Sequence, residues 1–258
     1  MNFQIWENVY SNFAAANKNK EGLGFSGSKY LERSLFAATE SLNALKTKRE
    51  IPFFHKQRNI DLAIIVSMML SGPTKKLRIL DFGGGFGISY MNLIESIPRI
   101  VDKIEYTVVD NYEVCTLAKR LFHEDLSIMF LESLPKNVDF DLVYTSSCIQ
   151  YTENWTETLQ ELCSLESKYI YFSDFFCALS KSFVSLQNYY ESKIPHWFIN
   201  LEEFQQELIR NGYNIEFKIP TNIERLGERN LVNLTNFGNG LIASQAFNLL
   251  FTKTDNHE

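Results

Sequence analysis

A glycine-rich stretch directly follows a short apolar run, and glycines at such a point can let the backbone approach a ligand closely. Residues 77–81 (LRILD) predict a buried β-strand, and residues 82–87 (FGGGFG) predict a tight turn before a helix that begins near Ile88. Glycine has no Cβ to hold a ligand away from the backbone, and it tolerates the positive φ angles of such a turn. The N-terminus of the following helix adds free N–H groups. The stretch therefore predicts a loop that binds a nucleotide-like cofactor.

The spacing of the glycines distinguishes two classes of cofactor. A dinucleotide-binding loop has the pattern G-x-G-x-x-G, in which a pyrophosphate lies against the end of the helix. Here the third glycine of that pattern would fall on Ile88 or Tyr90. The sequence instead has D-x-G-x-G-x-G, which begins at Asp81 and ends at Gly87. This spacing argues against a nicotinamide dinucleotide.

A second acidic residue ends the next predicted strand, residues 105–110 (EYTVVD). A carboxylate in the position of Asp110 accepts hydrogen bonds from both hydroxyls of a ribose, as in adenosine cofactors generally. A glycine-rich turn alone, or an aspartate at a strand end alone, is common in proteins. The two in this order are much more specific for a cofactor site.

The loop and Asp110 together resemble the first motifs of the class I S-adenosylmethionine-dependent methyltransferases. The resemblance implies an α/β, Rossmann-like class I methyltransferase fold, with a seven-stranded, mostly parallel sheet whose last strand is antiparallel. It implies S-adenosylmethionine as the cofactor and S-adenosylhomocysteine as its product. Asp81 would lie near the ammonium group, directly or through water, and Glu132 or a neighbour would lie beside the adenine. The predicted cofactor-binding residues are Asp81, Phe82, Gly83, Gly84, Gly85, Gly87, Asp110, Asn111, Glu132, Ser146 and Ser147.

Two later stretches resemble a narrower group of proteins. Residues 182–188 (SFVSLQN) and 195–200 (PHWFIN) are similar to stretches in a methyltransferase family associated with bacterial surface-polysaccharide gene clusters. This resemblance implies an acceptor that is a small molecule or glycan-related, methylated on oxygen or nitrogen. Residues 55–59 (HKQRN) depart from the family, where a Tyr-Glu-Arg-Asp-like run is expected.

The rest of the chain predicts the elements that position these residues. Apolar residues recur at helical spacing from Leu31 to Leu45, and a second helix is predicted over residues 56–70, so that residues 1–74 would form an N-terminal helical cap. Over residues 75–258, apolar runs alternate with helical patterns, which is typical of a parallel sheet. Cap and sheet would make one compact unit. The predicted strands are 77–81, 105–110, 127–131, 140–145, 169–176, 213–219 and 245–252, and the predicted helices are 88–96, 112–122, 155–165 and 201–211.

Catalysis of methyl transfer requires the protein mainly to align donor and acceptor and to exclude water. In an open α/β sheet the site lies beyond the carboxyl ends of the strands, which places residues 146–151, Asp174 and His196 there. His196 has the intrinsic pKa of a general base, Asp174 would orient an acceptor hydroxyl, and Tyr151 would stack on the acceptor or the adenine. The structural alternatives are packing of His196 beside Trp197, a turn cap at Asp174 and core packing of Tyr151.

Composition excludes several classes of function. Acidic residues number 31 against 25 basic ones, and a net charge of −6 argues against a nucleic acid partner. Four cysteines without a CxxC pair, and four histidines without an HxH or HExxH pattern, predict buried thiols and no metal site. The longest apolar run, residues 62–70, is far shorter than the roughly 18–20 residues that span a bilayer. The first residues lack the features of a secretory signal, so the expected location is the cytoplasm.

Two other functions remain open on the sequence alone. The cofactor fold could be a non-catalytic scaffold for protein partners, because no catalytic residue is beyond dispute. An NAD(P)-dependent oxidoreductase is the less favoured alternative, because of the glycine spacing. Residues 220–240 would form either an acceptor-binding lid or an exposed loop. The acceptor, the methylated atom and the oligomeric state are not predicted, nor is whether the N-terminal helices form a lid or a dimer interface.

Overall fold

The structure is a computed structural model, and it describes residues 5–52, 60–71, 76–97, 99–125, 127–221, 237–238 and 240–254. The chain divides into two compact units. One unit is Ser28–Tyr144, and the other combines Met1–Gly27 with Thr145–Glu258. The predicted division into residues 1–74 and 75–258 stays a prediction.

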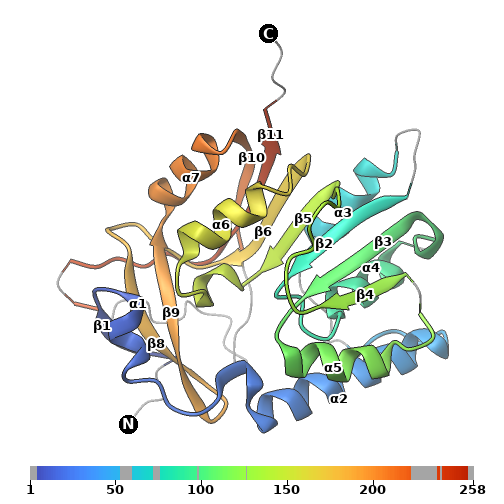
Figure 1. Cartoon of the computed structure of the whole chain (residues 1–258), viewed down its shortest axis with the longest axis horizontal. Helices are drawn as coiled ribbons and strands as arrows, with labels where there is room; N and C mark the ends of the chain where they lie inside the picture. Colours follow the sequence, from blue (N-terminus) through green and yellow to red (C-terminus); the bar gives the residue numbers. More distant parts are fainter. Residues whose placement is uncertain are drawn as a thin grey trace. The chain divides into compact units, whose positions relative to one another are not determined.

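The Ser28–Tyr144 unit contains three parallel strands that match the sequence pattern (Figure 1). Most of their residues are buried, as expected for parallel strands covered on both faces. Helix α2 contacts α4 and α5. The strands are β2 (Leu77–Phe82), β3 (Ile104–Val109) and β4 (Ile128–Leu131), and the helices are α2 (Ser28–Lys46), α3 (Ile60–Met69), α4 (Ile88–Ser96), the short 3-10 helix η3 (Val101–Lys103) and α5 (Tyr112–Leu121).

The main sheet has seven strands in the order β10-β11-β6-β5-β2-β3-β4. Strand β11 runs antiparallel to both β10 and β6. The predicted fold class is therefore confirmed, and each predicted strand or helix from residue 77 onward ends within two residues of the observed one. The four strands not yet given are β5 (Leu142–Ser146), β6 (Tyr169–Phe175), β10 (Tyr213–Pro220) and β11 (Phe247–Lys253).

A second, four-stranded sheet has the order β1-β8-β9-β7, which the sequence pattern does not predict. It consists of β1 (Trp6–Tyr10), β8 (Phe183–Tyr189), β9 (Ser192–Asn200) and the short β7 (Cys177–Ala178). Strand β1 corrects the expectation that the chain before residue 75 is helical. Its partner β8 lies far away in the sequence, and a local hydrophobic pattern carries no information on such a pairing.

Successive side chains of a strand point to opposite faces of its sheet. In this second sheet, both faces are packed against other hydrophobic residues. On one face Phe183 lies in a cluster with Trp6, Phe176 and Phe198. On the other face Val184 and Leu186 pack against the short helix α1 (Phe13–Asn17). The sheet is therefore part of a hydrophobic core and is fixed in position by it.

The remaining helices of this unit are the 3-10 helices η1 (Gly24–Ser26) and η4 (Ile149–Tyr151), then α6 (Trp155–Cys163) and α7 (Leu201–Arg210). Asn154 and Asn200 cap α6 and α7 through their side-chain oxygens. The first residues of the helix predicted over 56–70, and most of the lid predicted over 220–240, lie outside the described residues. Of the helices in the described ranges, none has the length and apolar character needed to cross a membrane.

Candidate functional site

The loop after β2 needs glycine for two different reasons. Gly83, Gly85 and Gly87 have φ angles of +73°, +57° and +73°, which favour glycine. At Gly84 the reason is space, because a Cβ there would lie 2.5 Å from Cγ of Asp81. The loop therefore passes directly over the carboxylate of Asp81, the next-to-last residue of β2.

Asp81 is the acidic residue of this loop, and only 1% of it is exposed. Its Oδ2 accepts a hydrogen bond from the hydroxyl of Tyr106 at 2.7 Å. Its Oδ1 is buried and has no hydrogen-bond partner in the described part of the chain. Burial raises the pKa of Asp81 to about 7, and the nearby charge of Asp110 adds to the rise, while the Tyr106 hydrogen bond opposes it.

Asp110 follows β3 and holds the loop from the other side. Its Oδ2 accepts a hydrogen bond from the backbone N–H of Gly85 at 2.9 Å, and its Oδ1 accepts one from the N–H of Asn111 at 2.7 Å. Burial raises the pKa of Asp110, and these two N–H groups lower it. Each carboxylate oxygen has a second lone pair, so Asp110 can still accept hydrogen bonds from a ribose.

The other predicted cofactor residues of this unit lie at the same edge of the sheet, beyond the carboxyl ends of parallel strands. Phe82 ends β2 and is half-buried. The Asn111 side chain accepts a hydrogen bond from the Val114 N–H at 2.9 Å and so caps α5. Glu132 follows β4, and its exposed carboxylate lies 3.9 Å from Nζ of Lys119. The structure thus brings the loop, Asp110, Asn111 and Glu132 to one edge of the sheet.

Three predicted residues lie at strand ends in the second unit, and two of them have left-handed backbones. Ser146 ends β5 and accepts a hydrogen bond from the Ser173 hydroxyl at 2.9 Å. Ser147 has φ +48° and Asp174 has φ +52°, which is uncommon for residues with a side chain. The Asp174 N–H donates to Oδ1 of Asn248 at 3.0 Å. Such strained positions often occur at functional sites.

His196, the predicted general base, lies on β9 and is 1% exposed. Its ring centroid lies 4.8 Å from that of Phe198, 5.0 Å from that of Tyr151 and 5.7 Å from that of Trp6. The alternative of packing beside Trp197 needs a correction, since successive residues of β9 face opposite sides of the sheet and Trp197 stacks on Phe13 instead. His196 is therefore enclosed by aromatic rings.

Tyr151 lies in η4 and contacts His196 edge to face. Its hydroxyl donates a hydrogen bond of 2.5 Å to Oε1 of the buried Gln187, and Phe25 makes an edge contact with its ring at 5.0 Å. Neither Gln187 nor Phe25 was predicted from the sequence, because both reach Tyr151 from distant segments. The aromatic surroundings of Tyr151 suit either stacking on a ligand or plain core packing.

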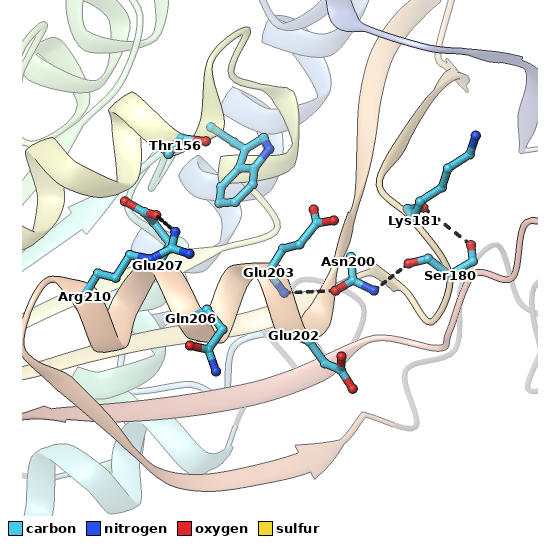
Figure 2. A pocket seen from close by; sticks show the side chains of 10 residues that line it. Thr156, Ser180, Lys181, Asn200, Glu202, Glu203, Gln206, Glu207 and Arg210 are labelled. Atoms are coloured by element: carbon cyan, nitrogen blue, oxygen red, sulfur yellow. Dashed lines mark hydrogen bonds and ion pairs between the residues drawn. The ribbon is translucent and has the colours of Figure 1, made fainter.

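A separate polar cavity of about 690 Å³ lies in the second unit beside α7 (Figure 2). Several of its polar groups already hydrogen-bond to one another. Asn200 donates to the Ser180 carbonyl and accepts from the Glu203 N–H, and Glu203 accepts from the Ser182 hydroxyl at 2.6 Å. No predicted site residue lines it. The cavity is lined by Trp155, Thr156, Ser180, Lys181, Asn200, Glu202, Glu203, Gln206, Glu207 and Arg210.

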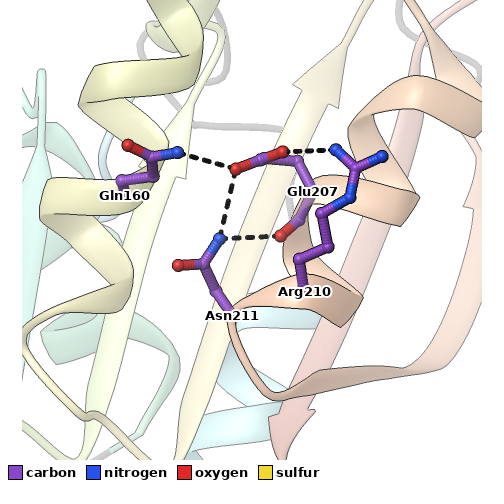
Figure 3. A network of polar contacts seen from close by, with 4 residues as sticks. All are labelled: Gln160, Glu207, Arg210 and Asn211. Atoms are coloured by element: carbon purple, nitrogen blue, oxygen red, sulfur yellow. Dashed lines mark hydrogen bonds and ion pairs between the residues drawn. The ribbon is translucent and has the colours of Figure 1, made fainter.

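One wall of this cavity contains a polar network that joins α6 to α7 (Figure 3). The buried Glu207 accepts hydrogen bonds from Gln160 at 2.8 Å, from Arg210 at 2.9 Å and from the side chain of Asn211. The hydrogen bond from Gln160, with those from Arg210 and Asn211, lowers the pKa of Glu207. The network is therefore a structural connection between helices. Within the ranges described, His, Cys, Asp and Glu side chains do not gather in threes that could hold a metal ion.

Comparisons with protein-family models and with curated proteins find no match. The fold is similar to that of a 1,6-didemethyltoxoflavin-N1-methyltransferase from Burkholderia thailandensis, solved with 1,6-didemethyltoxoflavin and S-adenosylhomocysteine. The identity is 14%, the TM-score is 0.53, and the match covers 97% of this chain and 95% of that one. A SAM-dependent methyltransferase from Methanosarcina mazei is 15% identical over 72% of this chain and 97% of its own, with a TM-score of 0.51. These likenesses show the fold, which is that of Rossmann-like methyltransferases.

Proposed function

We propose that the protein is an S-adenosylmethionine-dependent methyltransferase. The observation that carries the proposal is the glycine loop held between two carboxyl groups, the buried Asp81 below it and the half-buried Asp110 at its side. This loop lies at the carboxyl edge of parallel strands, where open α/β folds bind their ligands. The fold shared with methyltransferases supports the same conclusion.

The residues present fit this cofactor. Asp110 would accept the ribose hydroxyls, the negative charge of Asp81 would attract the ammonium group, and residues at the ends of β3 and β4 would border the adenine. The loop supplies a surface free of Cβ atoms, as close backbone approach requires. The sulfonium of the bound cofactor supplies a methyl group that is already activated. The proposed cofactor residues remain those predicted from the sequence, including Ser146 and Ser147.

The acceptor is proposed to be a small molecule or a glycan-related compound, methylated on oxygen or nitrogen in the cytoplasm. The resemblance of residues 182–200 to a surface-polysaccharide family supports a role in the biosynthesis of such polymers. Tyr151, Asp174 and His196 are the proposed catalytic residues, with the helices within residues 1–74 as a cap.

Calorimetric titration with S-adenosylmethionine and S-adenosylhomocysteine tests the proposal. We expect both to bind, and we expect Asp110→Ala to weaken binding by about tenfold or more, because hydrogen bonds to a charged group are lost. Asp102→Ala, which removes an exposed aspartate of the same unit, is the matched control and should bind as the wild type does. Failure of the folded wild-type protein to bind either compound would contradict the proposal.

A non-catalytic cofactor-fold scaffold is the second candidate, and the enclosure of His196 by aromatic rings favours it. Transfer of labelled methyl groups from S-adenosylmethionine to a cell extract separates the two functions. Labelled product that disappears in Tyr151→Phe or Asp174→Asn supports an enzyme. Cofactor binding without any labelled product supports a scaffold.

A further inference from the structure

Tyr106 was not predicted as a site residue, yet its hydroxyl donates a hydrogen bond to the carboxylate of Asp81. The tyrosine is 1% exposed and lies on β3, and its hydroxyl lies 2.7 Å from Oδ2 of Asp81. The second oxygen, Oδ1, is buried without a hydrogen-bond partner in the ranges that the structure describes. A carboxylate accepts up to about four hydrogen bonds, so Asp81 has capacity for a further positively charged or donor group.

The glycine loop makes this carboxylate sensitive to what the loop binds. A Cβ on Gly84 would lie 2.5 Å from Cγ of Asp81, so the loop backbone rests on the carboxylate. The apex of the loop is held by Asp110 through the Gly85 N–H. A ligand in the loop therefore lies close to both acidic residues.

Among the described residues, the groups that shift the pKa of Asp81 include no positive charge. They are the hydroxyls of Tyr106 on β3 and Ser89 on α4, and the carboxylate of Asp110, which follows β3. Burial raises the pKa of Tyr106, and its electrostatic interaction with Tyr144 on β5 adds to the rise. Burial and the like charge of Asp110 both oppose ionisation of Asp81, in agreement with its pKa of about 7. A cation bound nearby would favour the ionised form instead.

We propose that Tyr106 is a positioning residue for Asp81, and that Asp81 releases a proton when a cationic cofactor binds. The proposal rests on the proposed function, in which the cofactor carries an ammonium group. Before binding, at a pH below its pKa, Asp81 is a neutral carboxylic acid that accepts a hydrogen bond from the Tyr106 hydroxyl. On binding, its O–H bond breaks, the electron pair stays on the carboxylate, and the proton passes to the buffer. No bond of the cofactor changes in this step.

Proton release makes cofactor affinity depend on pH. The affinity for S-adenosylhomocysteine should rise by up to about tenfold per pH unit below the pKa of Asp81 and level off above it. Titrations from about pH 5.5 to about pH 8.5 span this transition, and because every variant binds the same ligand, the loss of its α-amino proton near 7.7–8.0 affects all of them equally. Calorimetry in two buffers of different ionisation enthalpy counts the protons released. We expect about one proton at the acidic end and fewer at neutral pH.

Three variants separate a positioning role from a structural one. Tyr106→Phe removes a hydrogen bond that favours the ionised acid, so the pH at which affinity levels off should move upward by about one unit. Tyr90→Phe is the matched control, because Tyr90 is also buried, packs 5.4 Å from the Tyr106 ring, and donates its hydroxyl to Asp125 instead. It should leave that pH unchanged. Asp81→Asn should bind without releasing a proton, and more weakly.

The outcomes distinguish this inference from the proposed function. Binding without proton release in the wild type, or the same pH midpoint in Tyr106→Phe and Tyr90→Phe, overturns the inference and leaves the proposed function standing. Absence of binding by the folded wild type at every pH overturns both. If Tyr106→Phe does not fold, the comparison of proton release between the wild type and Asp81→Asn decides the matter.

Discussion

Oδ2 of Asp110 accepts a hydrogen bond from the backbone N–H of Gly85 at 2.9 Å. The residue proposed to hold the ribose therefore also holds the apex of the glycine loop. A ribose that bonds to Asp110 meets a carboxylate already fixed by two backbone N–H groups. Because the carboxylate is already held in place, cofactor binding has a smaller entropic cost to offset.

Substituting Asp110 should loosen the loop even without a cofactor. In Asp110→Asn one acceptor oxygen has to serve where two served before, so one of the N–H groups of Gly85 and Asn111 loses its partner. Amide hydrogen exchange at Gly85 or at Asn111 should become about tenfold faster or more, equivalent to the loss of one charge-assisted hydrogen bond. The control Asp102→Asn should leave exchange at both positions unchanged, and unchanged exchange at both in Asp110→Asn would contradict the prediction.

Gly84→Ala should damage the site by collision rather than by backbone strain. Its Cβ would lie 2.5 Å from the buried carboxylate of Asp81, so the loop or the carboxylate must move. Gly212→Ala is the matched control, since Gly212 has φ +80° and nothing lies within 4 Å of its Cβ position. The control should lose about 1–2 kcal/mol of stability without loss of cofactor affinity. Gly84→Ala should lose cofactor affinity by calorimetry, and equal affinity in the two variants would show that the collision is tolerated.

The stability of the cofactor-free protein should depend on pH through Asp81. Burial raises its pKa from 3.8 to about 7, so between these values the folded chain keeps a proton that the unfolded chain has lost. The free energy of unfolding therefore falls as pH rises through this window, by up to roughly 4 kcal/mol. Asp81→Asn lacks this titration, so its stability relative to the wild type should increase from about pH 4.5 to about pH 8 in denaturant unfolding. Parallel pH profiles of the two proteins would refute it.

His196→Ala should be strongly destabilising whatever its part in chemistry. The ring lies among those of Trp6, Tyr151 and Phe198, and its removal leaves a cavity in the core. A loss of about 2–4 kcal/mol in the free energy of unfolding is expected. His123→Ala, which removes an exposed histidine, should change stability by no more than about 0.5 kcal/mol. Similar urea midpoints for the two variants would mean that the aromatic enclosure contributes little.

Glu207→Ala should lower the stability of the protein by weakening the connection between α6 and α7. The buried carboxylate accepts hydrogen bonds from Gln160 and Arg210, and its removal leaves those donors without that acceptor. We expect a loss of about 1–3 kcal/mol at neutral pH. Because the pKa of Glu207 is lowered, its contribution should be lost as pH falls through that pKa. Glu202→Ala, at an exposed position of the same helix, should cost less, and thermal unfolding at two pH values measures both.

The main sheet and the cofactor loop could be predicted because their signals are local. The run from Leu77 to Gly87 contains a strand, a turn and a helix start in one stretch, and Asp110 ends the next strand. Tyr106 could not be predicted as a site residue, because its contact with Asp81 depends on the register between β2 and β3. In the structure Tyr106 is paired with Ile79, which lies two residues before Asp81 and so on the same face.

The surroundings of His196 could not be predicted for a related reason. Its ring neighbours Trp6 and Tyr151 come from the start and the middle of the chain, and a helical or strand period in either segment does not specify the other. The hydrogen bond between Tyr151 and Gln187 likewise joins η4 to β8. Local sequence patterns predict individual helices and strands, whereas the surroundings of His196 are formed by contacts between elements that are distant in the sequence.

The pairing of β1 with β8 has a consequence during protein synthesis. Glu7 and Asn188, which share a hydrogen bond, are separated by 181 positions, so β1 leaves the ribosome long before its partner strand exists. Until residues 183–189 emerge, β1 has an unpaired backbone that a chaperone or another nascent chain can bind. Closing so large a loop is slow, so the second sheet should be among the last parts of the molecule to fold.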